Sequence, residues 1–247
     1  MPVHLPTTPN NVYSSREKAV NAATYPFELA YEDNYDHFFN KLFSGIEYSN
    51  AEYQNSQDVS SRFRKHISSM VRNIELKLPK TSRILEIGCG KGYFLEQLVH
   101  IGFENVFGYD ATYQGSSSRV QGRYFDQRDI GFGADAIILR HTLEHSPKPL
   151  GFLQDILRIN ANPQAQIFIE VPCFDWIRRS QSYWDLTIEH CNYFSRSSFE
   201  TMLPGAAISS VFDGQYLWIS ARASQLSISV NDEQDSPSAS KVVTPVN

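Results

Sequence analysis

Short apolar runs and helix-spaced apolar positions alternate along the middle of the chain. Short, mainly apolar runs predict buried strands at 84–87, 105–109, 134–139 and 166–171. Apolar residues on one helical face predict helices at 92–100, from about residue 147, and at 196–203. A weak strand at 124–125 and two terminal strands near 208–212 and 215–221 complete a set of seven. The alternation predicts an α/β fold, a Rossmann-like seven-stranded mostly parallel sheet with helices on both faces.

The segments outside this alternation differ in character. Apolar positions predict one helix from Tyr35 to Ile46 and a second over 63–74, which Pro79 ends. The first residues show no periodicity, and the last carry serine, aspartate and proline with little to bury. We therefore expect four parts: a flexible N-terminal arm at 1–25, an N-terminal helical cover at 26–80, the α/β core at 81–223, and a disordered tail at 224–247.

Composition narrows the class of protein. With 247 residues and 41% hydrophobic content, the chain can bury one good core with appendages. The net charge of -5 disfavours a nucleic-acid partner, which would need a basic face. No apolar run reaches the roughly 20 residues of a membrane span, and the first ten residues show no secretory signal. These features predict a cytoplasmic protein without a membrane partner, in an oligomeric state that they leave open.

A glycine-rich turn directly follows the first core strand. Gly88, Gly90 and Gly92 lie between this strand and a helix, so a nucleoside cofactor can approach bare backbone there. The third glycine comes one residue too early for the dinucleotide pattern Gly-x-Gly-x-x-Gly, which disfavours a nicotinamide cofactor. Asp110 ends the second strand, some twenty residues on. A carboxylate at that place in nucleoside-binding folds accepts both ribose hydroxyls, although a solvated turn aspartate would look the same.

A possible metal pattern follows the fourth strand. His141, Glu144 and His145 match a zinc-protease motif, which on a helix would place both histidines on one face. However, His141 directly follows a buried strand, Pro147 interrupts the segment, and the three cysteines of the chain are widely spaced. We therefore expect no metal. His141 is expected at the ligand-binding edge of the sheet, whereas His145 would pack or cap.

The segment 183–194 has no clean period and is rich in aromatic and acid–base side chains, which is more typical of a site than of a connector. It contains the block "WDLTIEHCNYFS". Together with "LEIGCGKGYF", "LRHTLEHSPKP" and "IEVPCFDWI", in that order along the chain, this block resembles class I S-adenosylmethionine (AdoMet) methyltransferases. The similarity extends to a bacterial subgroup of sugar C-methyltransferases and of methyltransferases from natural-product and polysaccharide clusters, and it spans roughly Tyr53 to Ala221.

The resemblance implies the cofactor and its binding residues. In such enzymes the acidic residue of the first motif faces the cofactor's methionine amine, and a later carboxylate accepts from the adenine amino group, which here would be Asp129. The residues implied to bind AdoMet are Glu86, Gly88, Cys89, Gly90, Gly92, Tyr93, Asp110, Ala111, Asp129, Arg140, His141, Tyr53 and Gln57.

The resemblance also implies methyl transfer to a small-molecule acceptor, such as a sugar or another cluster metabolite, on carbon or oxygen. His190 would take the acceptor's proton with Glu189 orienting it, or would only shape the pocket, and His141 would lie nearby. The cysteine-rich zinc module and the further C-terminal domain of the sugar C-methyltransferases are not seen, so the acceptor stays open. Two other classes remain: a non-catalytic AdoMet-binding partner subunit and, less favoured, a nicotinamide-dependent oxidoreductase.

Overall fold

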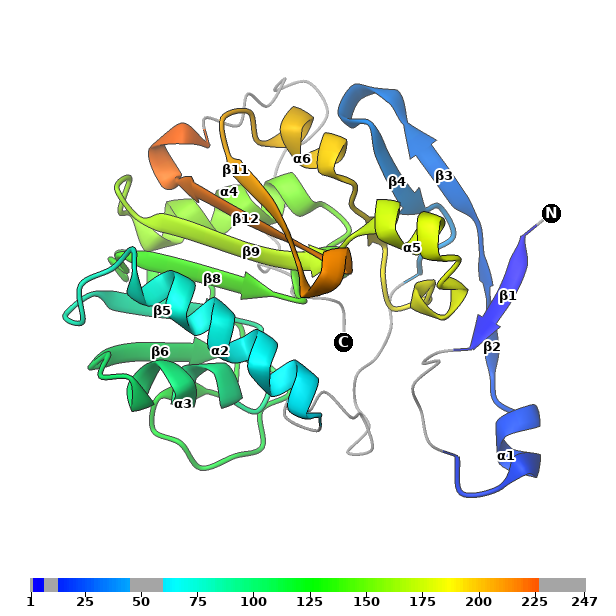
Figure 1. Ribbon diagram of the computed structural model, residues 1–247, viewed down its shortest axis with the longest axis horizontal. Coiled ribbons are helices and arrows are strands. Elements are labelled where there is room, and N and C mark those ends of the chain that lie inside the picture. Colours follow the sequence, from blue (N-terminus) through cyan, green and yellow to red (C-terminus); the bar gives the residue numbers. More distant parts are fainter. Residues whose placement is uncertain (1, 7–12, 45–59, 227–247) are drawn as a thin grey trace.

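The computed structural model describes residues 2–6, 13–44 and 60–226. Its centre is a seven-stranded sheet in the order β11-β12-β9-β8-β5-β6-β7 (Figure 1). The strands are β5 (Arg83–Ile87), β6 (Asn105–Tyr109), β7 (Val120–Gln121), β8 (Ala136–Arg140), β9 (Gln166–Pro172), β11 (Ala207–Val211) and β12 (Tyr216–Arg222). The five strands from β9 to β7 run parallel, and β12 and β11 are antiparallel to their neighbours. The predicted seven-stranded, mostly parallel sheet is confirmed.

Helices cover both faces of this sheet because successive residues of its buried strands point to opposite sides. In β5, Ile84 joins an apolar cluster with helices α2 and α3, whereas Leu85 joins one with α4 and α6. Those helices are α2 (Ser61–Glu75), α3 (Tyr93–His100), α4 (Pro149–Asn160) and α6 (Arg196–Met202). The helices predicted over 63–74, 92–100, from about 147 and over 196–203 are therefore confirmed.

The strand order places several loops at one edge of the sheet. β5 lies between β6 and β8, and the chain reverses its winding direction at this point. In open α/β sheets, a ligand crevice forms at such a switch point, beside the carboxyl ends of the strands. The residues that follow β5, β6 and β8 therefore converge on one crevice.

The helix expected from Tyr35 to Ile46 is wrong. The chain instead forms a hairpin of β3 (Leu29–Glu32) and β4 (His37–Asn40), and β4 also pairs with the short β10 (Asn192–Tyr193). Phe38 packs its ring against Phe174 at 4.8 Å between centroids. The pairing of β4 with a strand distant in the sequence, together with this aromatic packing, outweighs the local apolar spacing, which fitted a helix equally well. Ile46 lies outside the described residues.

Other elements were also not predicted from the sequence. In the arm expected to be irregular, β1 (Val3–Pro6) pairs with β2 (Thr24–Phe27), and α1 (Arg16–Val20) lies between them. The third parallel strand is β7 rather than 124–125, and α5 (Phe174–Ser180) follows β9. Short 3₁₀ turns complete the structure: η1 (Asp33–Tyr35), η2 (Gln127–Asp129), η3 (Leu143–His145), η4 (Tyr183–Asp185), η5 (Phe212–Gly214) and η6 (Ala223–Gln225). Of the expected tail, only 224–226 are described.

A membrane-spanning helix would have to be both long and apolar. Among the residues that the structure describes, no helix meets both conditions.

The pairing of β4 with β10 depends on Asn192. Its side-chain oxygen accepts from His37 Nε2 at 2.9 Å, and its amide nitrogen donates to the Ser146 carbonyl. All three groups are buried. We expect Asn192→Ala to lower the free energy of unfolding by about 1–3 kcal/mol, because it leaves two buried polar groups without partners. Urea unfolding followed by circular dichroism measures the change.

The matched control is Asn105→Ala, which removes one exposed hydrogen bond to the Thr81 carbonyl at 3.1 Å. We expect that change to stay within about 0.5 kcal/mol, as is usual for surface substitutions. Equal losses in the two variants would contradict a structural role for the β4–β10 pairing.

Candidate active site

The glycine turn at the end of β5 forms a cradle of bare backbone. Gly88, Gly90 and Gly92 all have positive φ, at 74°, 54° and 82°. A Cβ on Gly88 would lie 2.3 Å from Thr142 Oγ1, in the segment that follows β8. Only glycine combines this backbone conformation with so close an approach. The turn and the end of β8 are therefore packed directly against each other, and α3 begins at Tyr93 immediately afterwards.

Asp110, at the end of β6, lies against this turn. Its Oδ2 accepts from the Gly90 N–H at 2.8 Å, and its Oδ1 accepts from the backbone and hydroxyl of Thr112 at 2.8 and 2.7 Å. These bonds fix the carboxylate between the ends of β5 and β6. Ala111 follows at the exposed rim, and Cys89 is buried beneath the turn beside Gly108.

Glu86 is a buried carboxyl group beneath the turn. It is 2% exposed, and its Oε2 accepts no hydrogen bond within the described part of the chain. Burial raises the pKa of Glu86 to about 7, although the charge of Arg140 acts in the opposite direction. An acidic group without a partner at a ligand crevice is ready to receive a cationic group from a ligand.

A second buried carboxylate, Glu170, lies in β9 and organises the neighbouring strand end. Arg140 Nε donates to its Oε2 at 2.7 Å, and His66 of α2 bonds its Oε1. The guanidinium of Arg140 also stacks on Phe94, 4.4 Å from the ring centroid. Burial works to raise the pKa of Glu170, but the Arg140 charge and the His66 bond together lower it to about 2.

Sequence reasoning missed Glu170 and His66, although a signal was present for each. Glu170 interrupts the apolar run of β9, and His66 lies on the buried face of α2. Arg140, expected at the cofactor, is almost fully buried and bonded to Glu170. Its charge lies near Glu86 and acts to lower the pKa of that carboxyl group.

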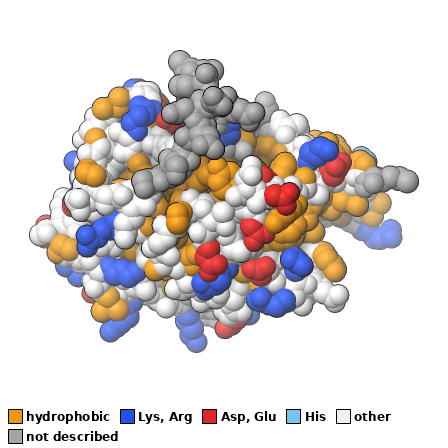
Figure 2. Space-filling model, turned by 90° about the horizontal axis from the view of Figure 1, so that it is seen from above, with side chains coloured by type: hydrophobic (Ala, Val, Ile, Leu, Met, Phe, Trp, Pro, Cys, Tyr) orange, Lys and Arg blue, Asp and Glu red, His pale blue; other side chains and the backbone are white. Residues whose placement is uncertain are grey.

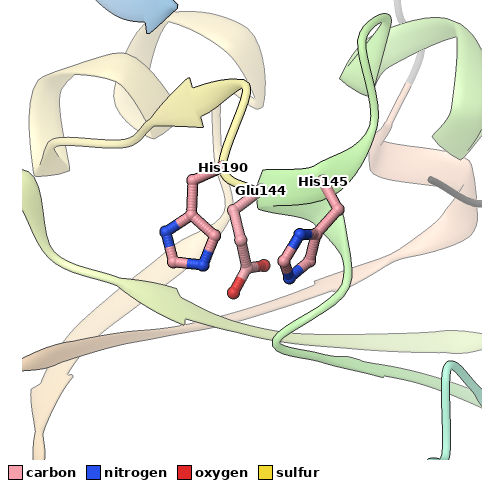
Figure 3. A group of neighbouring side chains, drawn as sticks. All are labelled: Glu144, His145 and His190. Carbon is pink, nitrogen blue, oxygen red and sulfur yellow. The ribbon is translucent and has the colours of Figure 1, made fainter. Parts of the chain in front are cut away.

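The segment after β8 and the predicted site loop meet at the same strand ends. His141 follows β8 with φ of 49°, an unusual conformation for a residue other than glycine, and its Nδ1 lies 3.5 Å from Glu144 Oε1. Next to it, the carboxylate of Glu144 points between the rings of His145 and His190 (Figure 3). The rings of His145 and His190 are 4.8 Å apart between centroids.

Two backbone contacts hold the two loops together. His145 Nδ1 donates to the Glu189 carbonyl at 2.8 Å, and the Cys191 N–H donates to the Glu144 carbonyl at 3.0 Å. The carboxylate beside His190 is thus that of Glu144, and Glu189 contributes its backbone oxygen. Burial, followed by the influence of His145, lowers the pKa of His190 to about 3. Its imidazole is therefore neutral at physiological pH.

Asp129, expected to accept from adenine, has another role in the structure. Arg123 donates to both of its oxygens at 2.7 Å, the Tyr109 hydroxyl donates to Oδ1 at 2.9 Å, and the Asp126 N–H donates to Oδ2 at 3.1 Å. Four donors occupy the carboxylate, so it secures the loop after β7. Tyr53 and Gln57, also expected at the cofactor, lie outside the described residues.

The fold and this crevice agree with a comparison to protein families. A family described as "Methyltransferase domain" matches residues 59–206, more than half of the chain. The chain belongs to this methyltransferase-domain family. It is an AdoMet-dependent methyltransferase, and AdoMet is its cofactor. The buried Glu86 oxygen, the bare glycine backbone and Asp110 suit a cofactor that carries an amine and a ribose.

Solved structures show the same fold. The PH0226 protein from Pyrococcus horikoshii is 16% identical with a TM-score of 0.50, over 66% of this chain and 92% of its own. A chain from the complex of the Haloferax volcanii Trm112 methyltransferase activator with a putative methyltransferase is 13% identical with a TM-score of 0.50. The match covers 65% of this chain and 91% of that one. The plantazolicin methyltransferase BpumL is 20% identical with a TM-score of 0.47. The match covers 62% of this chain and 69% of that one. No curated protein sequence matches the chain significantly.

The close approach of Gly88 to Thr142 can be tested. We expect Gly88→Ala to lower the free energy of unfolding by at least about 2 kcal/mol and to weaken AdoMet at least about tenfold, because the turn must shift. Gly102→Ala is the matched control, since Gly102 also has a positive φ, of 99°, but has nothing within 4 Å of an added Cβ. It should cost only about 1–2 kcal/mol and leave AdoMet affinity unchanged. Calorimetric titration and thermal unfolding of both variants decide, and equal effects would contradict the cradle.

Proposed function

We propose that this enzyme methylates a small-molecule acceptor bound at the carboxyl end of β8. The proposal rests chiefly on one observation: the loop 183–191 returns to the sheet and places His190 beside Glu144. The methyl acceptor would lie there, opposite the glycine turn. Its reacting atom would face His141, Glu144 and His190, within a largely buried group of side chains.

The cofactor side of the proposed site uses the residues at the ends of β5 and β6. Glu86 would bind the amine of AdoMet, the backbone of Gly88 to Gly92 would lie against its sugar and methionine portions, and Asp110 would accept from the ribose hydroxyls. AdoMet supplies an activated methyl group on a sulfonium ion. The protein's task is then to align the acceptor and exclude water, and to deal with the acceptor's proton.

The acceptor side favours a compact polar molecule. Tyr183 and Trp184, in the loop that leads to His190, are 63% and 62% exposed, and such rings can stack on a flat or sugar-like ligand. On the face seen in Figure 2, basic side chains of the described residues are scattered among acidic and apolar ones, and no broad basic patch is visible. This fits the net charge of -5 and supports a small acceptor over a nucleic acid.

The acceptor atom is proposed to be a hydroxyl oxygen or a carbon beside a carbonyl, as in a sugar or a related metabolite. A hydroxyl oxygen reacts as it gains negative charge itself, and a carbon beside a carbonyl reacts as the carbonyl oxygen gains negative charge. We propose Glu144 and His190 as the pair nearest that oxygen, in place of the pair Glu189 and His190. An imidazole with a pKa of about 3 is a weak base, so His190 alone gives little drive for proton removal.

The proposed role of Glu86 predicts how AdoMet affinity depends on pH. Because the pKa of Glu86 is raised to about 7, its neutral form dominates below that pH. A cationic amine needs the ionised form, so affinity should fall as pH drops below 7, approaching about tenfold per pH unit. The other charged groups facing Glu86 are Arg140, Asp110 and Glu170.

Calorimetric titration of AdoMet between pH 5.5 and 7 measures this dependence. Glu86→Gln should bind AdoMet more weakly at pH 7 and with a flat profile, whereas Glu104→Gln, at an exposed position, should behave as wild type. An unchanged slope in Glu86→Gln would remove Glu86 from the proposed cofactor site.

The acceptor site is tested by His190→Asn, which keeps a polar side chain in the loop. We expect AdoMet affinity to stay nearly unchanged, and the single-turnover rate of methyl transfer to fall about 10²–10⁴-fold, the usual effect of losing a group that moves a proton or stabilises charge on the reacting oxygen. His100→Asn, on the exposed end of α3, is the control. The acceptor is first sought among small hydroxylated compounds with radiolabelled AdoMet. Parallel losses of affinity and rate would show that His190 only supports the cofactor pocket.

A further inference from the structure

We propose that Glu144, His145 and His190 bind one divalent transition-metal ion, and that this ion holds the oxygen of the methyl acceptor. The site would lie in the crevice beyond the carboxyl end of β8, where the structure brings the three side chains together (Figure 3). The inference departs from the expectation of no metal drawn from the sequence. It also rests on the proposed function for the role of the ion, although not for its binding.

The donor atoms already face one another. Each residue offers one ligand atom, and these atoms all lie within 4.8 Å of one another. Two atoms bound to one ion at about 2.1 Å are at most about 4.2 Å apart, so small side-chain rotations would complete the site. The carboxylate of Glu144 and a ring nitrogen of each histidine point into the same space (Figure 3).

Glu144 supplies a separate reason to expect a cation. Its side chain is only 1% exposed, yet neither carboxylate oxygen accepts a hydrogen bond within the described part of the chain. Among the described residues, the charged contact of this carboxylate is His141 Nδ1, at 3.5 Å. A buried carboxylate with so few donors is poorly satisfied, and a bound cation would satisfy it.

The surroundings orient the two histidines as metal ligands. His145 Nδ1 donates to the Glu189 carbonyl at 2.8 Å, a contact that fixes the tautomer with its lone pair on Nε2. Metal-bound histidines usually donate their other nitrogen in this way. The Cys191 N–H bond to the Glu144 carbonyl, at 3.0 Å, ties the loop of His190 to the other two ligands.

The donor set indicates which ion would bind. Two imidazole nitrogens and one carboxylate oxygen suit Zn²⁺, Fe²⁺ or Co²⁺, whereas Mg²⁺ and Ca²⁺ prefer oxygen ligands throughout. Three protein ligands leave at least one position open, as in catalytic rather than structural sites. The sequence motif alone did not reveal this set, because its third ligand comes from a distant loop and its first histidine is not a member.

The ion would help the acceptor to lose its proton, a task for which His190 alone is a weak base. An acceptor hydroxyl bound to the ion loses its proton to solvent more readily, because the metal charge stabilises the resulting oxygen anion. As the new carbon–oxygen bond forms, the carbon–sulfur bond of AdoMet breaks, its electron pair stays on sulfur, and a neutral thioether leaves. For a carbon acceptor, the proton on that carbon would pass to solvent, the ion would stabilise the resulting enolate oxygen, and the new bond would form to carbon as the carbon–sulfur bond breaks.

The test uses the full chain, stripped with a chelator and then freed of it. We expect one Co²⁺ per chain by calorimetry, with visible absorption bands of a low-coordinate site, and competition by Zn²⁺ but not by Mg²⁺. Glu144→Gln and His190→Ala should each weaken Co²⁺ at least about 100-fold, beyond the roughly 10–100-fold typical of losing a residue that only orients a ligand. His100→Ala, at an exposed position, should bind Co²⁺ as the wild type does.

AdoMet binding, measured in parallel without metal, separates the two proposals. If the stripped wild type takes up neither Co²⁺ nor Zn²⁺, or if both site variants keep wild-type affinity, the metal site is refuted. AdoMet binding in that case leaves the proposed function standing, with His190 acting by itself. Metal binding without AdoMet binding would refute the cofactor site instead. Thermal unfolding checks each variant, and if Glu144→Gln fails to fold, His190→Ala decides, because His190 is less buried than Glu144.

Discussion

The ion pair between Glu170 and Arg140 is the interaction on which the crevice depends. It joins β9 to β8 within the fully buried centre of the sheet, and His66 extends it to α2. Breaking a buried pair on one side is strongly destabilising, because the other charge remains buried. The pair also lies beside Glu86. Burial raises the pKa of Glu86 to about 7, with the charge of Arg140 acting to lower it and that of Glu170 acting to raise it. Glu86 and Glu170, two carboxyl groups in one sheet, thus differ in pKa because their surroundings differ.

The proposed acceptor side is assembled in a different way from the proposed cofactor side. The glycine turn, Glu86 and Asp110 follow neighbouring strands of the sheet and need only the α/β core to be in place. Glu144 and His190 meet because one loop is bonded to another, through Cys191 and the Glu189 carbonyl. A constant cofactor platform and a separately built acceptor side allow the same fold to serve many acceptors.

Features that depend on local periodicity can be predicted from the sequence, whereas contacts between segments far apart in the chain were missed. The glycine turn, the main helices of the core and all of its strands except β7 were predicted near their observed places, because each has its own periodicity or backbone requirement. The segment 35–46 was read as a helix because aromatic positions four apart fit either structure, and only the pairing with β10 decides between them. Asp129, expected at the adenine, is bonded to Arg123 and Tyr109, and such contacts between distant side chains leave no local pattern in the sequence. The adjacent Glu189 was expected to orient His190, and the structure also brings Glu144 beside it from another loop.

The pairing of β4 with β10 has a consequence for how the protein is made. His37 and Asn192, which are bonded in the folded state, are 155 positions apart in the chain. At a synthesis rate of roughly 5–20 residues per second, β4 leaves the ribosome about 8–30 s before its partner exists. During that interval the aromatic hairpin of β3 and β4 has an open edge on which another nascent chain could pair. The pairing of β4 with β10 therefore forms late, and the yield of folded protein depends on how well that edge is protected until residue 192 has emerged.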